Sequence, residues 1–308
     1  MTPCSPITTI RSLPQWALLC LVVVVSAAAL LAACGGSGGG SSPTPTATVT
    51  VTSTPSASPS PTTAPTATPS ATTTLSLYFL RGEGLGVAER RVPVTTKPAT
   101  AALEALLAGP AASERAAGLT SAVPSGTRLL GLSINGTTAR VDLSARFAAG
   151  GGSLSMQARV AQIVYTLTRF KTVETVMFML EGSAVEALGG EGLMLGEGQR
   201  RSDWRSFEPA IFVETPGVGA LLSTPFTLSG TASVFEGSFT ARLVDGAGHS
   251  IVRTQVQASA GAPGRGRFRE AIPFDTTSSS GTLLVFDQSM EDGSRLDEVR
   301  IPVTFAQQ

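Results

Sequence analysis

The sequence predicts an α+β domain followed by an all-β sandwich, with an apolar N-terminal segment and a long tether in front of both. Three observations predict this arrangement. An apolar run at residues 16–31 is followed by an uncharged stretch over 35–74. Helical and strand patterns alternate over 75–204, where we place the first domain. Only short strand patterns, separated by turn residues, occur over 209–305, where we place the second.

The charge balance and the cysteine positions exclude several classes of function. The 308 residues include 22 Lys plus Arg and 22 Asp plus Glu, so no net charge favours nucleic acid or an anionic lipid surface. The three cysteines, Cys4, Cys20 and Cys34, all lie in or beside the N-terminal apolar run. The region after Cys34 therefore contains neither a disulfide nor a zinc–thiolate site, and we expect no metal and no cofactor.

The N-terminal apolar run predicts export and lipidation. Residues 16–31 are shorter than the roughly 20 apolar residues that span a bilayer, and they are typical of a signal-peptide core. The run ends on Leu31-Ala32-Ala33-Cys34, which resembles the lipobox of bacterial lipoproteins. The resemblance implies that residues 1–33 are a signal peptide and that lipidated Cys34 holds the chain on the extracytoplasmic face of the membrane. An uncleaved anchor with an incidental cysteine is the alternative.

Residues 34–74 are predicted to be a disordered tether of Gly, Ser, Pro and Thr. Residues 35–74 contain no charge, no aromatic residue and no leucine, so they bury too little apolar surface to offset the entropy of ordering. Their proline and threonine favour extended conformations, which would hold the folded domains away from the lipid.

The first domain is predicted to follow the order β-α-β-β-α-β-β, with its helices on one face of a mixed sheet. Alternation predicts a strand over 75–80, and Pro98 with Gly109-Pro110 delimits a helix. Asn135-Gly136 predicts a hairpin. The pairing around that turn would place five apolar residues on one buried face: Leu130, Leu132, Ile134, Ala139 and Val141.

A second helix and a central strand complete this domain. Ser153 or Ser155 caps the helix, whose apolar residues recur at helical spacing through Leu167. Residues 173–180 are apolar on both faces, which predicts a central strand, and Glu181-Gly182 turns it toward a partner near 185–188.

Four segments carry a family resemblance for this domain. They read YFLRGEGLGVAERRVPV, ALEALLAGP, PSGTRLLGLSINGTTARVDLS and RVAQIVYTLTRFKTVETVMFMLEG. They resemble the GerM-type domain (GerMN) of sporulation and spore-germination lipoproteins. The resemblance implies a fold like the ring-building motif of envelope-spanning secretion assemblies, and a protein-interaction module rather than a catalyst.

The second domain is predicted to be an immunoglobulin-like sandwich. About seven strands occur in roughly 95 residues, without a cysteine pair. They are expected at 211–213, 226–232, 239–244, 251–257, 266–272, 282–287 and 295–305. The segments FTLSGTASVFEGSFTARLVD and GAPGRGRFREAIPF resemble the immunoglobulin-like domain of bacterial spore germination proteins.

Motifs suggestive of a catalytic, nucleotide or metal site are weak. His249 is the sole histidine and lies beside a turn, so a Ser-His-Asp triad has little support. The glycines of 82–86 and 189–192 do not complete a dinucleotide-binding motif and are expected in turns. Acidic residues gather over 287–298 without calcium-loop spacing, and we expect a solvated face.

Three residues are candidates for partner contact: Phe235, Glu236 and Arg265. Phe235 lies between strands, where an aromatic side chain either meets a partner or, as we favour, covers one end of the sandwich core. Arg265 stands where the family often has an aromatic residue.

These features predict a non-catalytic, lipid-anchored scaffolding protein of the bacterial envelope, with envelope proteins as partners. The alternative is a lipoprotein that binds a cell-wall glycan or a small ligand, with a contact to peptidoglycan. Trp204 is the only tryptophan outside the signal segment, and the scarcity of aromatic platforms disfavours sugar binding. An envelope hydrolase is the third hypothesis, and the sequence offers it no metal cluster, histidine triad or paired carboxylates.

Overall fold

The computed structural model describes residues 71–189 and 192–306. The predicted signal peptide, almost all of the tether, and the lipobox residues Leu31, Ala32, Ala33 and Cys34 lie outside these residues. No helix within the described ranges is long and apolar enough to cross a membrane.

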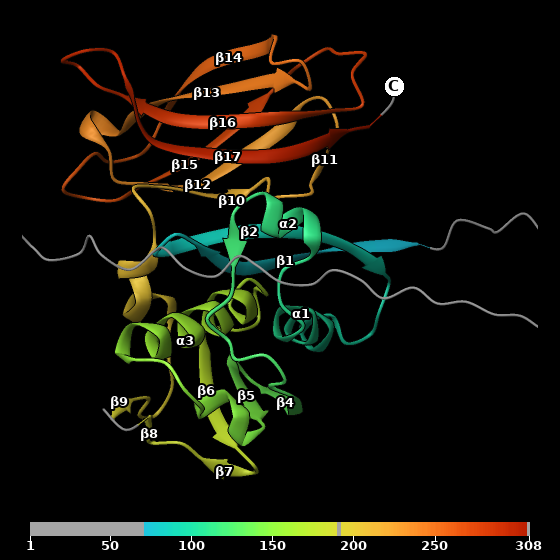
Figure 1. Cartoon of the computed structure of the whole chain (residues 1–308), viewed down its shortest axis with the longest axis vertical. Helices are drawn as coiled ribbons and strands as arrows, with labels where there is room; N and C mark the ends of the chain where they lie inside the picture. Colours follow the sequence, from blue (N-terminus) through green and yellow to red (C-terminus); the bar gives the residue numbers. More distant parts are fainter. Residues whose placement is uncertain (1–70, 190–191, 307–308) are drawn as a thin grey trace, which may run out of the picture. The chain divides into compact units, whose positions relative to one another are not determined.

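The first domain contains three α-helices, two 3-10 helices and nine strands within the described part of the chain (Figure 1). In chain order they are β1 (Thr72–Arg81), β2 (Gly84–Pro93), α1 (Pro98–Leu107), α2 (Ala112–Ala116), β3 (Leu119–Thr120), β4 (Leu129–Asn135), β5 (Thr138–Leu143), η1 (Ala145–Ala148), α3 (Ser153–Leu167), β6 (Thr175–Leu180), β7 (Ser183–Ala184), β8 (Ala187–Leu188), β9 (Leu193–Met194) and η2 (Arg201–Phe207).

The α+β class of this domain is confirmed, but its layers differ from the expected single mixed sheet. One sheet has the order β2-β1-β3, a second has the order β4-β5-β6-β7, and β8 pairs with β9. Helix α1 contacts β1 and β4, while α3 contacts β1 and β6. The two longer helices therefore lie between the two main sheets rather than on one outer face (Figure 1).

Strand β2 is absent from the predicted element order. It pairs antiparallel with β1 along its whole length, from Arg81↔Gly84 to Thr72↔Pro93. Gly82 and Glu83 form the turn, and Gly82 adopts a positive φ of 60° that favours glycine. The glycines of 82–86 were expected only in turns, whereas Gly84 and Gly86 belong to the strand.

The hairpin of β4 and β5 has a different register from the expected one. Its turn is Gly136–Thr137, with Gly136 at a φ of 58°, so Leu132 pairs with Val141 and Ile134 with Ala139. A bulge displaces Leu130 from the ladder. Ala139 and Val141 are buried as predicted, but Leu130 and Ile134 are 45% and 39% exposed. The expected five-residue buried face is therefore wrong on the β4 side.

Helix α3 buries three polar side chains as well as its apolar stripe. Arg159, Gln162 and Thr166 are at most 2% exposed. Arg159 donates hydrogen bonds to the carbonyls of Phe147 and Gly150, at 2.6 Å and 2.9 Å, which satisfies its guanidinium in the interior. The helix has Gly152 at its N-cap and no side-chain cap, so the predicted serine cap is wrong.

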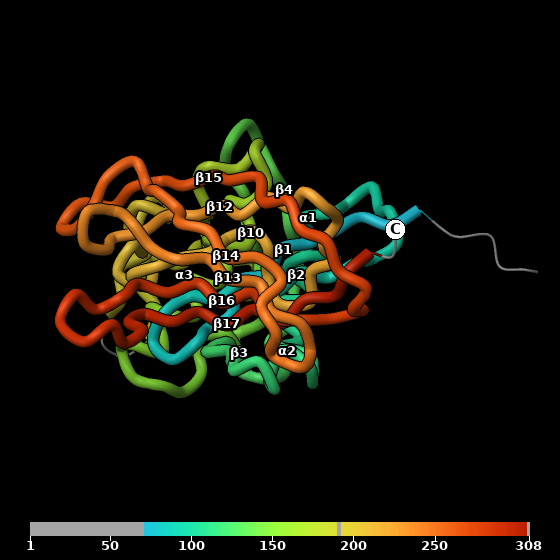
Figure 2. The backbone as a smooth tube through the Cα atoms, turned by 90° about the horizontal axis from the view of Figure 1, so that it is seen from above, coloured from blue at the N-terminus to red at the C-terminus, as the bar shows by residue number. Residues whose placement is uncertain are grey.

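The second domain is a sandwich of two sheets, as predicted. Its elements are β10 (Ile211–Thr215), β11 (Leu221–Leu222), β12 (Phe226–Ala232), η3 (Phe235–Gly237), β13 (Ser238–Asp245), β14 (Ser250–Gln257), β15 (Gly266–Ile272), β16 (Ser280–Gln288) and β17 (Arg295–Phe305). The sheets have the orders β10-β12-β15 and β11-β17-β16-β13-β14. Figure 2 shows β16 beside β17 and β12 beside β15 within these two sheets.

The two domains share a continuous hydrophobic core. Phe212 of β10 packs against Tyr78 of β1 and Tyr165 of α3, with ring centroids 6.1 Å and 5.9 Å apart. Val218, after β10, exchanges backbone hydrogen bonds of 2.8 Å with Val87 and Glu89 of β2. The second domain therefore packs on the first through side-chain contacts and through backbone hydrogen bonds.

Candidate functional site

The structure brings no catalytic or metal-binding set together from the residues considered above. His249 is 83% exposed, and its Nδ1 lies 3.2 Å from Asp245 Oδ2. Glu298, in the acidic segment, is held by Arg295 at 2.7 Å and by Arg300 at 2.5 Å. No group of three metal-ligating side chains occurs in the part of the chain that the structure describes.

Phe235 and Glu236 lie on an exposed turn of the second domain. The Phe235 side chain is 65% exposed, so the interpretation that it covers an end of the core is wrong. Glu236 adopts a φ of 53°, and its carbonyl accepts a hydrogen bond of 2.8 Å from Gln257. A role for these two residues in partner contact stays a prediction.

Arg265 lies at the junction of the domains and binds the segment that joins them. Its Nε is 3.3 Å from Glu208 Oε2, and its Nη2 donates to the carbonyls of Glu208 and Pro209 at 3.2 Å and 3.0 Å. A fourth contact joins its Nη1 to Thr231 Oγ1 at 3.2 Å. Arg265 therefore fixes the end of η2 against the second domain, while its role toward a partner stays a prediction.

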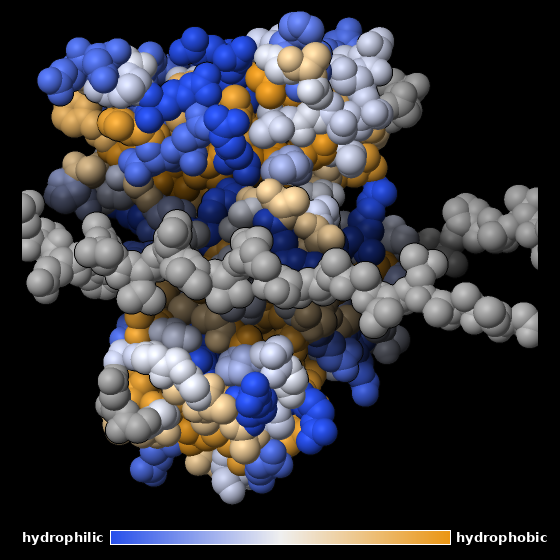
Figure 3. Space-filling model, viewed as in Figure 1, coloured by the Kyte–Doolittle hydropathy of each residue, from blue (hydrophilic) through white to orange (hydrophobic). Residues whose placement is uncertain are grey.

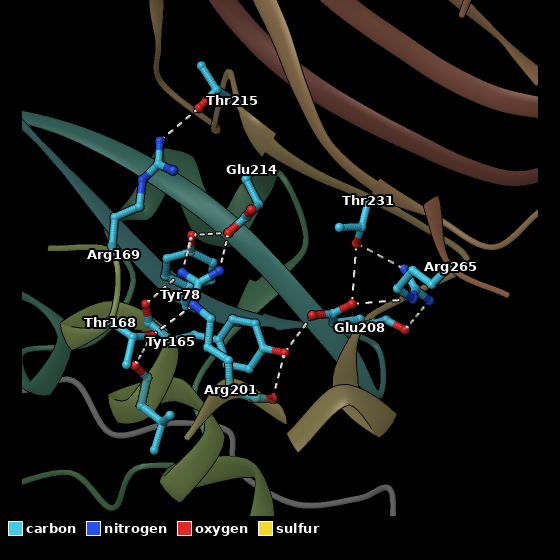
Figure 4. A network of polar contacts seen from close by, with 11 residues as sticks. Tyr78, Tyr165, Thr168, Arg169, Arg201, Glu208, Glu214, Thr215, Thr231 and Arg265 are labelled. Atoms are coloured by element: carbon cyan, nitrogen blue, oxygen red, sulfur yellow. Dashed lines mark hydrogen bonds and ion pairs between the residues drawn. The ribbon is translucent and has the colours of Figure 1, made fainter. Parts of the chain in front are cut away.

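A polar network centred on Arg201 joins η2, β1, α3 and β10 (Figure 4). Arg201 Nη1 lies 2.6 Å from Glu214 Oε1, which also accepts a 2.5 Å hydrogen bond from the Tyr78 hydroxyl. Arg201 Nε donates to Thr168 Oγ1 at 2.8 Å. Its guanidinium also lies over the rings of Tyr78 and Tyr165, 5.1 Å and 4.6 Å from their centroids.

Tyr165 extends this network to Arg265. Its hydroxyl donates to Glu208 Oε1 at 2.7 Å, and the other oxygen of Glu208 accepts from Thr231 at 3.2 Å. The polar groups from Tyr78 on β1 to Arg265, just before β15, therefore form one connected series at the junction, shown in Figure 4.

Burial and charge together set the protonation states of this network. Burial alone raises the pKa of Glu214, but the charge of Arg201 and hydrogen bonds from Tyr78 and Arg201 outweigh it and lower that pKa. Burial is the main cause that raises the pKa of both Tyr78 and Tyr165. Burial lowers the pKa of Arg201, but Tyr78 and Glu214 outweigh it and raise that pKa. At neutral pH, Glu214 and Arg201 are charged and both tyrosines are neutral donors.

No local sequence pattern indicates this network. Tyr78, Tyr165, Arg201 and Glu214 lie on four different elements, up to 136 residues apart. Each looks by itself like a polar residue at the margin of an apolar stripe. The available signal was that the only two tyrosines in the chain lie within the predicted strand over 75–80 and the predicted helix that runs through Leu167, where a buried hydroxyl needs a hydrogen-bond partner.

Strand β4 provides an exposed sheet edge. It is the terminal strand of the order β4-β5-β6-β7, and its sequence LLGLSIN carries no charge. A groove of about 470 Å³ runs beside it, lined by Leu130, Leu132 and Ile134 together with Lys97 at the start of α1 and Phe170 after α3. Figure 3 shows hydrophobic residues among hydrophilic ones over the surface of this half of the domain.

These features define the class of protein. An α+β domain is joined through a buried polar network to an immunoglobulin-like sandwich, and the described part of the α+β domain has an exposed sheet edge at β4. Residues 76–186 match the family described as "Sporulation and spore germination" (Germane). Residues 210–294 match the family described as "Immunoglobulin-like domain of bacterial spore germination" (Gmad2). The chain thus carries a Germane domain followed by a Gmad2 domain, which confirms both resemblances.

Solved structures also show similarity to the chain. The tandem GerMN domains of the sporulation protein GerM from Bacillus subtilis match with 18% identity and a TM-score of 0.39, covering 66% of this chain and 62% of that one. The first GerMN domain of the same protein matches with 21% identity and a TM-score of 0.36, covering 42% of this chain and 99% of that one. The chain therefore spans less than two thirds of the tandem-domain structure. No curated protein matches it.

Proposed function

We propose that this chain is a non-catalytic, lipid-anchored protein on the extracytoplasmic face of a bacterial membrane, and that it binds another envelope protein through the free edge of β4. The sporulation and germination families of both domains support the setting. The observation that carries the proposal is the β4 edge, because an uncharged edge strand with exposed apolar side chains is a template for strand addition.

The backbone geometry of β4 suits the addition of a strand. Thr137 and Leu143 use their carbonyls to accept from Glu174 and Glu181, on the β6 side, so the even-numbered residues of β5 face β4. In this register Ser133 pairs with Arg140, which turns the backbone groups of Leu132 and Ile134 toward the free edge. A partner strand would bond to these groups.

The side chains beside this edge add specificity. Leu130 and Ile134 are exposed and line the same groove. In strand addition, the main chain supplies affinity while pockets for alternate side chains select the sequence. A partner strand with apolar residues at alternate positions fits this groove.

The N-terminal sequence supports the anchor. Lipidation of Cys34 would leave residues 35–70 as a spacer before β1, and such a chain extends at about 3.1 Å per residue when fully extended, or about 100 Å in all. The β4 edge would then reach partners well above the lipid surface.

Site-specific photo-crosslinking in the native host tests the proposal. A benzoylphenylalanine residue at Leu130 of the full chain should give a discrete adduct with one envelope protein. The same probe at Leu154, which is 57% exposed on α3, should give none. Equal crosslinking at both positions, or none at Leu130, contradicts docking at this edge.

Two variants at one position separate strand addition from simple apolar contact. Ile134→Pro removes an N–H on the free side and should abolish the Leu130 adduct, whereas Ile134→Ala keeps that N–H and should retain most of it. Circular dichroism of both variants controls for folding. If purified peptidoglycan alone sediments the chain and no protein adduct forms, the glycan-binding alternative replaces this proposal. Trp204 is only 6% exposed and offers no sugar platform.

A further inference from the structure

A second groove lies at the junction of the domains and is rich in arginine. It has a volume of about 560 Å³ and is bounded by η2 on one side and by β12 and β15 on the other. Its lining includes five arginines and only two carboxylates. The arginines are Arg201, Arg205, Arg265, Arg267 and Arg269, and the carboxylates are Glu208 and Glu214.

The two carboxylates are already neutralised within the chain. Glu214 is paired with Arg201, and Glu208 with Arg265. Arg205, Arg267 and Arg269 are exposed, and their guanidinium groups form no ion pair or hydrogen bond among the residues that the structure describes. Three uncompensated cations therefore face one groove in a chain whose overall charge is balanced.

The spacing of these cations favours a linear ligand. Arg267 and Arg269 are two residues apart on β15, so they lie on the same face of the sheet, about 7 Å from each other. Arg265, just before β15, also lines the groove but is bound to Glu208, and Arg205 of η2 lines the groove as well. Guanidinium groups recognise phosphate oxygens through paired hydrogen bonds. A polymer that carries one phosphate in each short repeat would place successive phosphates against successive guanidinium groups.

Two further features narrow the class of ligand. The edge of β15 is occupied at Arg267, whose carbonyl accepts from Ser259 N at 2.9 Å and whose N–H donates to Ser259 Oγ at 2.9 Å, so a peptide cannot add there as a strand. The one aromatic residue in the lining, Phe268, is only 4% exposed and offers no surface on which nucleobases stack.

We infer that this groove binds a linear polyol-phosphate polymer, that is, a phosphodiester polyanion without bases, through Arg205, Arg267 and Arg269. This site is separate from the β4 edge, and neither proposal depends on the other.

Binding of poly(glycerol phosphate) to the full chain, measured in neutral detergent over a series of salt concentrations, tests the inference. The variant Arg205→Gln/Arg267→Gln/Arg269→Gln should lose about tenfold or more in affinity, as expected for three exposed ion pairs. The matched control Arg91→Gln/Arg140→Gln/Arg253→Gln removes the same charge from exposed arginines elsewhere and should stay within about twofold of wild type.

The other outcomes decide against the site or against its ligand. Equal losses in both triple variants mean attraction by net charge alone and overturn the inference. Tighter binding of poly-glutamate, or of an oligothymidylate with the same number of charges, overturns the ligand class in favour of an acidic peptide or a nucleic acid. Failure of wild type to bind any of the three polyanions overturns the site.

Discussion

Arg201 holds the junction of the two domains together, and Arg201→Met tests that role. The substitution keeps an apolar stem of similar length but removes the cation that neutralises Glu214. It also removes the hydrogen bond to Thr168 and both contacts with the tyrosine rings. Among the described residues, Glu214 would then keep one side-chain hydrogen bond, from the Tyr78 hydroxyl, in a largely buried position.

The expected loss follows from burial. Removing one partner of a fully buried ion pair costs about 3–5 kcal/mol. The side chains of Arg201 and Glu214 are 29% and 17% exposed, so solvent screening reduces the loss, and we expect about 2 kcal/mol for the pair. The two cation–π contacts add about 1 kcal/mol together. The free energy of unfolding should therefore fall by roughly 3 kcal/mol.

Urea denaturation followed by far-ultraviolet circular dichroism measures this loss. Arg295→Met is the control, because Arg295 also pairs with a glutamate and lies over an aromatic ring, but on the surface, with 38% exposure. It should cost less than about 1 kcal/mol. The double variant Arg201→Met/Glu214→Gln should recover part of the loss, because no buried charge is left unpaired. Equal losses for Arg201→Met and Arg295→Met would refute the reasoning.

Three further predictions concern acid, the sandwich core and the exposed turn. The pKa of Glu214 is held below its ordinary 4.5, so its stabilisation is present at neutral pH and lost as the pH falls through the lower folded value. The stability difference between wild type and Glu214→Gln, measured by urea denaturation, should therefore shrink below about pH 4. Gly230→Ala would drive its Cβ into the Phe212 carbonyl oxygen, and should lower the free energy of unfolding by about 3 kcal/mol or more; a loss under about 1 kcal/mol would contradict this. Phe235→Ser should change thermal stability by no more than about 0.5 kcal/mol, since the ring is 65% exposed.

The second domain could be predicted almost residue by residue. The observed bounds of β12, β15 and β17 are those expected from the sequence, because short alternating strands with Gly, Pro and Asp turns between them carry a strong local signal. The missing element is β11, which has two residues and pairs in parallel with the end of β17. Its partner lies more than 80 residues away, so no local pattern indicates it.

The first domain shows where local patterns fail. Strand β2 begins with Gly-Leu-Gly, which favours a turn by composition. It forms because β1 supplies a ten-residue partner and because Leu85 and Val87 enter the core. The β4–β5 turn takes Gly136 as its first residue rather than its second, which shifts the pairing by two positions and leaves the same face inward. The exposure of Leu130 and Ile134 depends on how α1 and the segment after α3 pack beside β4, and the sequence does not encode this locally.

The candidate sites also differ in whether a local sequence pattern indicates them. The predicted lipobox is a local motif of four consecutive residues, and it stays a prediction. The Arg201 network and the arginine groove depend on the docking of two domains, and each assembles residues from at least three elements. Arg265 illustrates the difference, because in the sequence it is a turn residue and in the structure it binds the linker carbonyls of Glu208 and Pro209.

Intact-mass and N-terminal peptide analysis of the protein isolated from its native membrane tests the proposed anchor most directly. We expect the mature chain to begin at Cys34, with a diacylglyceryl thioether on its sulfur, and Cys34→Ala to abolish membrane retention of both domains. A native chain that retains residues 1–33 with an unmodified Cys34 would contradict the account.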